Sequence, residues 1–380
     1  MTTDYRKPLA LILAIYVLLA IGYGLATPLF EAPDEQHHFF TASAIAANRR
    51  LPTTGDEYSH LTGQEAAQPP LYYLIAALIA GPFDLVLSEE VIWPNPAVQL
   101  GAADSPHNIN AFVHTEAESW PWRDHVLVAH LHRLLSALLG LGTLLAVFSC
   151  ARLVWPASPE RALLATALVA FLPQFVFLHG SISNDPLIIL LCSAAIWQLL
   201  RMWYGEMDWL RLALLGLTVG LAILSKTAGL LLFAYALVFV GLIAWREQRG
   251  RSLGKKLQQV VGPLLAVAIP ALALGGWLLW RNWELYGDIT AASEFVRLAG
   301  GDRDYSLIQV LKETPGLWKS LFAVFGWFNV LAPQWIFLIW YGIVAAAVAG
   351  ALSGVWRDLR AAGHSQADHG EGIQAAQSVS

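Results

Sequence analysis

The segment EAPDEQHH, residues 31–38, gathers acidic and imidazole side chains directly after the first long apolar run. Pro33 is typical of a helix start, and in a helix that begins near Asp34 the side chains of His37 and His38 share a face with it. A carboxylate beside an imidazole can act as a general base or supply metal ligands. The alternative is that these residues only end the apolar run and solvate a helix whose aromatic side chains face lipid.

Three basic residues and an Asn-Asp pair lie near the ends of other apolar runs. In the motif NDP, Asn184 and Asp185 also fit an ordinary turn and helix start. The basic residues, Arg133, Lys226 and Arg281, suit an anionic partner, although Lys226 could simply reach the headgroups and Arg281 could anchor a helix end beside tryptophans. Each signal is weak alone, and together they favour a site for an anion.

The composition identifies the environment of these residues. The chain has 380 residues, of which 56% are hydrophobic and 13% charged, and its mean hydropathy is +0.52, whereas soluble domains are about 25% charged. Several runs can cross a hydrocarbon layer of about 30 Å as helices, and they lack the alternation of barrel strands. The sequence therefore predicts an all-α integral membrane protein.

We expect about eight transmembrane helices. Lys and Arg residues concentrate in the short connections, as the positive-inside rule requires, if both termini are cytoplasmic. Two long connections, about 30–126 and 281–333, then lie outside and carry most of the acidic residues. The predicted location is the cytoplasmic (plasma) membrane, with several passes. The predicted spans are residues 8–29, 127–154, 162–178, 187–204, 210–224, 228–245, 259–280 and 334–352.

One further apolar run, residues 68–87, is interrupted by Gly81 and Pro82. Counting it as a span would place the basic cluster 246–256 outside, so we expect an interfacial or re-entrant helix in the first outer loop. Residues 317–330 are similar. The predicted organisation is a transmembrane domain over residues 1–357 and a polar, disordered tail over 358–380.

At these residues the chain resembles the GT-C superfamily of membrane glycosyltransferases, which includes aminoarabinose transferases and protein O-mannosyltransferases. Four segments carry the resemblance in order: APDEQHHF, QPPLYYL, the Arg-led span HRLLSALLGLGTLLAVFSCARLV, and GLAILSKTAGLLL. NDP, RNWELYGD and FGWFNV are similar to an uncharacterised prokaryotic branch. The likeness covers about residues 8–330. Relatives usually have eleven or more spans.

The resemblance implies an enzyme that transfers a hexosyl or pentosyl group from a polyprenyl-phosphate-linked donor to a lipid, glycan or protein acceptor. Transfer would occur on the extracytoplasmic face with inversion. No metal carries over, because the motif is not Asp-x-Asp, and a divalent ion stays an open alternative. The implied roles are Asp34 and Glu35 as catalytic residues, Lys226, Arg281 and Arg133 as donor-phosphate ligands, Asp185 and Asn184 in a donor or metal loop, His37, His38, Tyr72 and Tyr73 as cavity-lining residues, and Asp34, His38 and Asp185 as candidate metal ligands.

Two non-enzymatic classes compete with this prediction. One is a transporter, flippase or assembly partner for envelope lipids, and the other is a degenerate GT-C core that serves as a scaffold. Transporters commonly carry charges near the membrane centre and show repeat symmetry, whereas here the charges cluster at the predicted outer boundary and the halves differ. The basic cluster 246–256 is explained by topology, so no nucleic-acid partner is expected.

Overall fold

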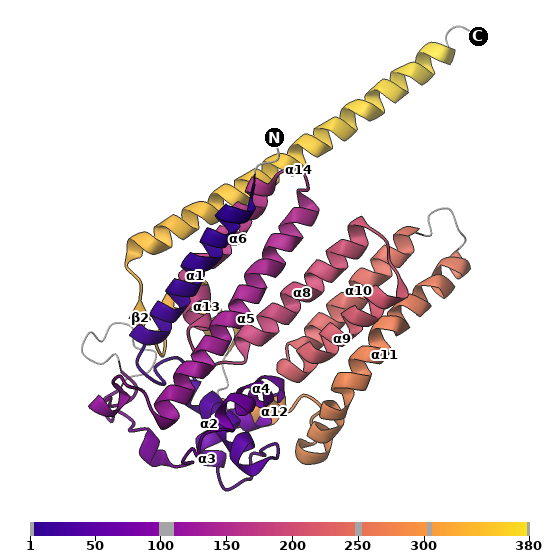
Figure 1. Ribbon diagram of the computed structural model, residues 1–380. Coiled ribbons are helices and arrows are strands. Elements are labelled where there is room, and N and C mark those ends of the chain that lie inside the picture. Colours follow the sequence, from indigo (N-terminus) through magenta and orange to yellow (C-terminus); the bar gives the residue numbers. More distant parts are fainter. Residues whose placement is uncertain (1–3, 99–109, 248–252, 302–305, 378–380) are drawn as a thin grey trace.

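The computed structural model describes residues 4–98, 110–247, 253–301 and 306–377. Helices make up nearly all of its regular structure, and six of them are long and apolar enough to cross a bilayer. The structure thus confirms an all-α, multi-span membrane protein (Figure 1). The six helices are α1 (Arg6–Ala26), α5 (Asp124–Val154), α8 (Asp185–Tyr204), α10 (Gly229–Glu247), α11 (Leu253–Tyr286) and α14 (Gln334–Gln377).

Two of the eight predicted spans differ from this set. Residues 162–178 form α6 (Pro159–Ala170) and α7 (Pro173–His179), which are bent by 64° relative to each other. Pro173 explains the break, since proline lacks the N–H that a continuous helix needs and disfavours helical backbone before it. Residues 210–224 form α9 (Trp209–Ser225), whose 17 residues make it a shorter apolar helix. It nevertheless packs along α8, α10 and α11.

The two long connections lie at the same end of the bundle, opposite the N-terminus (Figure 1). We call this the loop end. Thr54 donates a hydrogen bond of 2.6 Å to Glu294, so the two connections also contact each other. The elements of the first connection are α2 (Glu35–Asn48), α3 (Ser59–Thr62), η1 (Gly63–Ala67), α4 (Leu71–Ala80), η2 (Glu89–Val91) and η3 (Glu116–Glu118).

The second connection contributes two helices and a small sheet. The strands pair antiparallel, with Val324 opposite Leu331 and Phe325 opposite Val330. Val324 N–H donates to the side chain of Gln174 on α7 at 2.9 Å, which fastens the hairpin to the bundle. The elements are α12 (Ala292–Leu298), α13 (Leu307–Ser320), β1 (Val324–Phe325) and β2 (Val330–Leu331).

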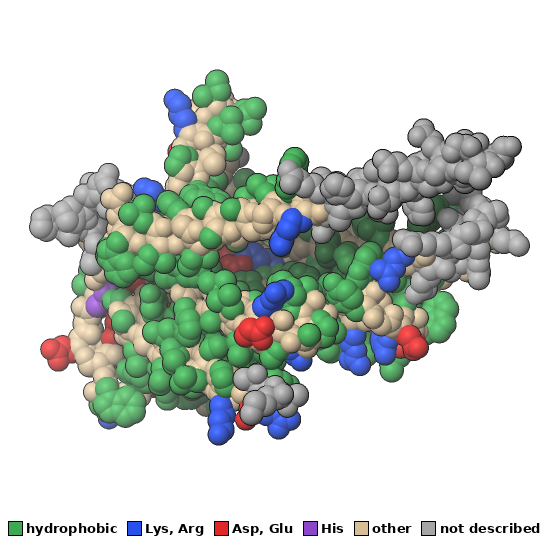
Figure 2. All heavy atoms as spheres, turned by 90° about the horizontal axis from the view of Figure 1, so that it is seen from above, with side chains coloured by type: hydrophobic (Ala, Val, Ile, Leu, Met, Phe, Trp, Pro, Cys, Tyr) green, Lys and Arg blue, Asp and Glu red, His purple; other side chains and the backbone are tan. Residues whose placement is uncertain are grey.

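The apolar run 68–87 contains α4, which has ten residues and is too short to cross a bilayer. This agrees with its exclusion from the predicted spans. The other end of the molecule carries arginines in terminal turns of helices, namely Arg152 of α5 and Arg201 of α8. Figure 2, which views that end, shows Lys and Arg side chains distributed over it among hydrophobic ones.

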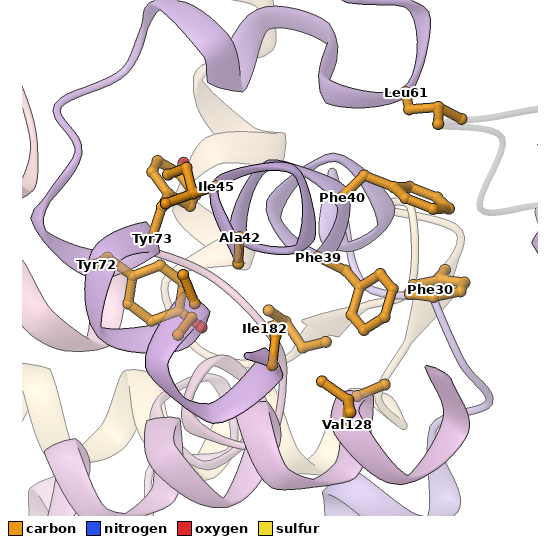
Figure 3. Close-up of a cluster of buried hydrophobic side chains, with 14 of the residues drawn as sticks. Phe30, Phe39, Phe40, Ala42, Ile45, Leu61, Tyr72, Tyr73, Val128 and Ile182 are labelled. Carbon is orange, nitrogen blue, oxygen red and sulfur yellow. The ribbon is translucent and has the colours of Figure 1, made fainter. Parts of the chain in front are cut away.

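A hydrophobic core joins the loop-end helices to the bundle (Figure 3). Phe39 and Phe40 of α2 are 1% and 0% exposed, so they do not face lipid as an isolated interfacial helix would require. Burial of each such side chain stabilises by about 1.5–3 kcal/mol. Tyr72 and Tyr73 of α4 and Val128 of α5 complete this core. The loop end is therefore a packed part of the fold.

A buried ion pair fixes α2 against α5. Arg133 Nε and Nη2 donate to the two carboxylate oxygens of Glu35 at 2.8 and 2.7 Å. The remaining guanidinium N–H groups donate to the backbone carbonyls of Gly24, Thr27 and Pro28. All five donors of an arginine are thus used within the protein. Both side chains are almost completely buried.

Helix α14 continues past residue 357 to Gln377. The sequence predicts a disordered tail over 358–380, and the structure differs over its described part. Alanine and glutamine favour helix even where apolar periodicity ends, and they recur in this segment. Residues 378–380 lie outside the described part.

We predict that Arg133→Ala destabilises the fold by about 3–5 kcal/mol, because it leaves Glu35 as an unpaired buried charge. Thermal unfolding of the protein in detergent or nanodiscs measures this change. Arg161→Ala is the control, since Arg161 is exposed in the first turn of α6. The double variant Glu35→Gln/Arg133→Met should recover part of the loss. An unfolding temperature of Arg133→Ala equal to that of the control would contradict the role of the pair.

Candidate functional site

A cavity of about 320 Å³ opens at the loop end. This volume is in the range of small-molecule sites. Its walls come from the first connection, the α7–α8 turn, the end of α9 and the second connection. The lining residues are Pro33, Asp34, His38, Glu65, Gln68, Gln174, Phe177, Leu178, Ser181, Ser183, Asn184, Asp185, Lys226, Phe295, Val324, Gly326 and Phe328.

Asp34 lies in the turn immediately before α2 and lines the cavity. It precedes the helix in the left-handed conformation, at φ 59°, and its side chain does not cap the helix. Aspartate tolerates this conformation better than most residues, at a cost of about 1–2 kcal/mol. Among the described residues the carboxylate has no hydrogen-bond partner, and the side chain is half-buried. The Asp34 carboxylate can thus accept a proton or contact a ligand.

Lys226 and Asp185 form an ion pair that also lines the cavity. Lys226 is the residue at which α9 ends, with extended backbone. Asp185 begins α8, where Pro186 suits the first turn and Ser183 accepts the Asp185 N–H at 3.1 Å. The two side chains are 30% and 33% exposed, so the ammonium can still reach a ligand in the cavity.

A glycine sets the direction of the chain after Lys226. A Cβ on Gly229 would lie 2.3 Å from the backbone of Ala222. Only glycine allows α10 to start this close to α9, and the tight reversal holds Lys226 at the loop end.

His38, Tyr73 and Glu65 form a buried polar cluster behind Asp34. The Tyr73 hydroxyl lies 2.9 Å from His38 Nδ1 and donates to Glu65 Oε2 at 2.5 Å. Burial raises the pKa of the Glu65 carboxyl to about 7. Burial also lowers the pKa of the His38 imidazole to about 4, so it is neutral at neutral pH. Near neutral pH the cluster therefore contains a neutral His38 imidazole and a Glu65 carboxyl group that is only weakly acidic.

Sequence analysis did not identify Glu65. The available signal was a single acidic side chain in an otherwise uncharged segment, which precedes Pro69, Pro70 and the start of α4. Its partner Tyr73 lies eight residues further along the chain, inside α4. The contact therefore crosses the start of a helix and follows no simple periodicity.

Several predicted site residues lie elsewhere. Glu35 and Arg133 are occupied by each other and by backbone groups, including the Ile182 N–H that donates to Glu35 at 2.9 Å. Arg281 donates to the Pro52 carbonyl at 2.9 Å and ties α11 to the first connection. None of these three residues lines the cavity. They hold the loop end in place.

The other predicted residues divide in the same way. His37 Nδ1 lies 2.7 Å from the Leu61 carbonyl, and Tyr72 is fully buried in the core, so neither lines the cavity. Asn184 does line it and places its amide 3.4 Å from the Tyr73 hydroxyl. Tyr73 does not line the cavity itself and reaches it through His38, Glu65 and Asn184.

The candidate metal ligands Asp34, His38 and Asp185 do not form a metal centre. In the described parts of the chain, no group of three or more His, Cys, Asp or Glu side chains is arranged to hold a metal ion. Asp185 is paired with Lys226, and His38 Nδ1 is engaged by Tyr73. The described residues therefore hold no preformed group of three ligands, and a divalent ion stays an open alternative.

The second connection closes the cavity with apolar side chains. Phe295 of α12 and Phe328 of the β1–β2 turn line it together with Gly326. Phe328 and Gly326 both have positive φ, at 61° and 57°. Gly326 and Phe328 belong to the motif FGWFNV, and Phe295 follows the motif RNWELYGD, so part of the quoted resemblance falls on the cavity wall.

Comparison with known proteins gives one family. Residues 118–288 match the family model described as dolichyl-phosphate-mannose-protein mannosyltransferase. This segment runs from the start of α5 to the end of α11 and includes Asp185 and Lys226. A comparison with curated proteins finds no match. The family match confirms the resemblance to the GT-C superfamily and supports a membrane glycosyltransferase of that type.

Proposed function

We propose that the protein transfers a hexosyl or pentosyl group from a polyprenyl-phosphate-linked donor to a lipid, glycan or protein acceptor, with inversion. The observation that carries this proposal is the shared cavity of Asp34 and Lys226. Asp34 offers a carboxylate that has no hydrogen-bond partner among the described residues, and Lys226 offers a cation at the end of α9. A base and a phosphate ligand are the two groups that such a transfer requires.

The chemistry follows from the leaving group. A phosphate ester leaves without the proton that an alkoxide needs, so one carboxylate base is sufficient where glycosidases use two. Asp34 accepts the proton of the acceptor hydroxyl as that oxygen attacks the anomeric carbon. The bond between this carbon and the phosphate oxygen breaks, and its electron pair stays on the phosphate. Attack from the side opposite the phosphate inverts the configuration.

Lys226 neutralises the charge that develops on the phosphate. A fixed cation in a site with little water is effective because it needs no reorganisation during the reaction. Asp185 holds the ammonium in position before the donor binds, and Asn184 belongs to the same donor-binding loop. A phosphate would approach the ammonium from the open side of the cavity.

The loop end is assigned to the extracytoplasmic face. The opposite end carries arginines in helix-terminal turns, including Arg152 and Arg201, whereas the loop end holds most of the described acidic side chains. The positive-inside rule then makes both termini cytoplasmic in a plasma membrane. Residues 1–357 would form the catalytic membrane domain.

Asp34→Asn should reduce sugar transfer by about 10²–10⁴-fold, because the amide cannot accept the proton. The assay uses membranes or nanodiscs with a panel of labelled polyprenyl-phosphate hexoses and pentoses, including dolichyl-phosphate mannose. Asp84→Asn is the matched control, since Asp84 is exposed in the same connection and outside the cavity. Full transfer by Asp34→Asn would exclude Asp34 as the base. Donor translocation without transfer by the wild-type protein would instead support a flippase.

Lys226→Met should lower kcat/KM for the donor by about 10²-fold, because it removes the charge that stabilises the leaving phosphate. Asp185→Asn keeps the ammonium and should lose less. Because the two residues act as a pair, the double variant should be no weaker than Lys226→Met alone. Lys312→Met, at an exposed position of α13, is the control. Equal activities of Lys226→Met and this control would remove Lys226 from the site.

A further inference from the structure

The buried Tyr73 hydroxyl is the centre of a hydrogen-bonded chain that the proposed reaction does not use. It joins Glu65 of η1, His38 of α2 and Asn184 of the loop before α8. Tyr73, Glu65 and His38 are 1%, 3% and 5% exposed. Polar groups this buried are costly unless they are paired, so the arrangement of their protons is constrained.

The contacts determine which ring nitrogen of His38 carries the proton when Glu65 is ionised. Tyr73 has one hydroxyl proton, and it donates this proton to the Glu65 carboxylate. The phenolic oxygen can then only accept from the histidine. His38 Nδ1 also lies 3.3 Å from Glu65 Oε2, so it faces two oxygen atoms. A protonated Nδ1 fits this environment, and a lone pair there would be repelled by both oxygens.

The other ring nitrogen is directed to the cavity. His38 lines the cavity, and its Nε2 has no hydrogen-bond partner in the described chain. Nε2 is not a fully buried atom without a partner, so it is accessible from the cavity. A neutral ring with the proton on Nδ1 has a lone pair on Nε2.

We propose that Glu65 and Tyr73 hold His38 in the Nδ1–H form, so that Nε2 accepts a hydrogen bond from a substrate hydroxyl in the cavity. His38 is then a binding residue, and Glu65 and Tyr73 are positioning residues. The inference rests on the proposed function for the identity of the hydroxyl, which belongs either to the transferred sugar or to the acceptor. The proton arrangement itself rests only on the contacts of the cluster.

Protonation of Glu65 reverses the chain. A neutral Glu65 donates to the Tyr73 oxygen, Tyr73 donates to His38 Nδ1, and the ring proton moves to Nε2, which no longer accepts. Other charged or titratable groups face this cluster from the elements around it. They are Asp34 before α2, His37 on α2, Tyr72 on α4, Asp185 on α8 and Lys226 after α9. The reversal of the chain follows the ionisation of Glu65, so it should occur around the Glu65 pKa of about 7.

The first test is the tautomer of His38, measured by nitrogen-15 NMR of histidine-labelled full-length protein in nanodiscs at pH 8. The His38→Gln variant assigns the signal. We expect the Nδ1–H form in the wild type and in Tyr58→Phe, whose phenol lies in the same connection outside the cavity. Tyr73→Phe/Glu65→Leu lacks both oxygens, and its His38 should revert toward the Nε2–H form that an isolated imidazole favours.

An Nε2–H or doubly protonated His38 in the wild type would overturn the inference. A double variant with the wild-type tautomer would do the same. If the double variant does not fold, the wild-type signal alone decides. This readout needs no transfer activity, so it remains decisive if the proposed function fails.

The second test separates the source of the hydroxyl. His38→Ala should raise KM about tenfold for one substrate, with little change in kcat, since it removes one hydrogen bond to a neutral group. A rise in the donor KM assigns the hydroxyl to the sugar, and a rise in the acceptor KM assigns it to the acceptor. In the wild type, this KM should fall as pH rises through about 7, because Glu65 becomes ionised. In Glu65→Gln this pH step should be absent.

An unchanged KM for both substrates in His38→Ala would overturn the substrate contact. A pH step that persists in Glu65→Gln would overturn the role of Glu65. Absence of transfer by the wild-type protein with every donor of the panel would instead reject the proposed function and leave the tautomer result intact.

Discussion

The pairing of Arg133 with Glu35 is the interaction on which the loop end depends. The guanidinium uses all five donors on Glu35 and on three carbonyls at the end of α1. One side chain of α5 thereby fixes where α1 stops and where α2 begins. Two charges can stay buried because each is fully hydrogen-bonded. The same pair explains the conformation of Asp34, since Glu35 must turn inward to Arg133 and the preceding residue, in the left-handed conformation, faces the cavity.

The cavity follows from this constraint. Most polar groups around it are already paired within the protein: Asp185 with Lys226, and His38 with Tyr73 and Glu65. Asp34 differs, because its carboxylate has no partner in the described part of the chain. An unpaired carboxylate that shares a cavity with a weakly acidic Glu65 and with the Lys226 ammonium is an arrangement that costs stability, and such sites are commonly functional. Phe295 and Phe328 supply an apolar part of the same cavity wall.

Sequence reasoning could predict the features that depend on local pattern. Apolar length predicted six of the membrane helices. Residue types at helix ends favoured an anion site, and of the residues chosen on that ground Asp34, Asp185 and Lys226 line the cavity, whereas Arg133 and Arg281 do not. It could not predict that Glu35 belongs to Arg133, because this pair spans 98 positions and only the folded packing selects it over Asp34. Glu65 was missed although its partner Tyr73 is only eight residues away, because the contact crosses the start of α4 and follows no helical periodicity. The break before Pro173 was visible as a proline within an apolar run, yet the 64° bend depends on how α7 packs.

The central claim is that Asp34 and Lys226 act on one polyprenyl-phosphate sugar within this cavity. The most direct measurement is a structure of the full-length protein in nanodiscs with a non-hydrolysable polyprenyl-phosphonate sugar bound. The account predicts the phosphonate in contact with Lys226 Nζ and the anomeric carbon on the side of the cavity that faces Asp34. A donor bound elsewhere on the molecule, or bound with Asp34 remote from the anomeric carbon, would contradict it.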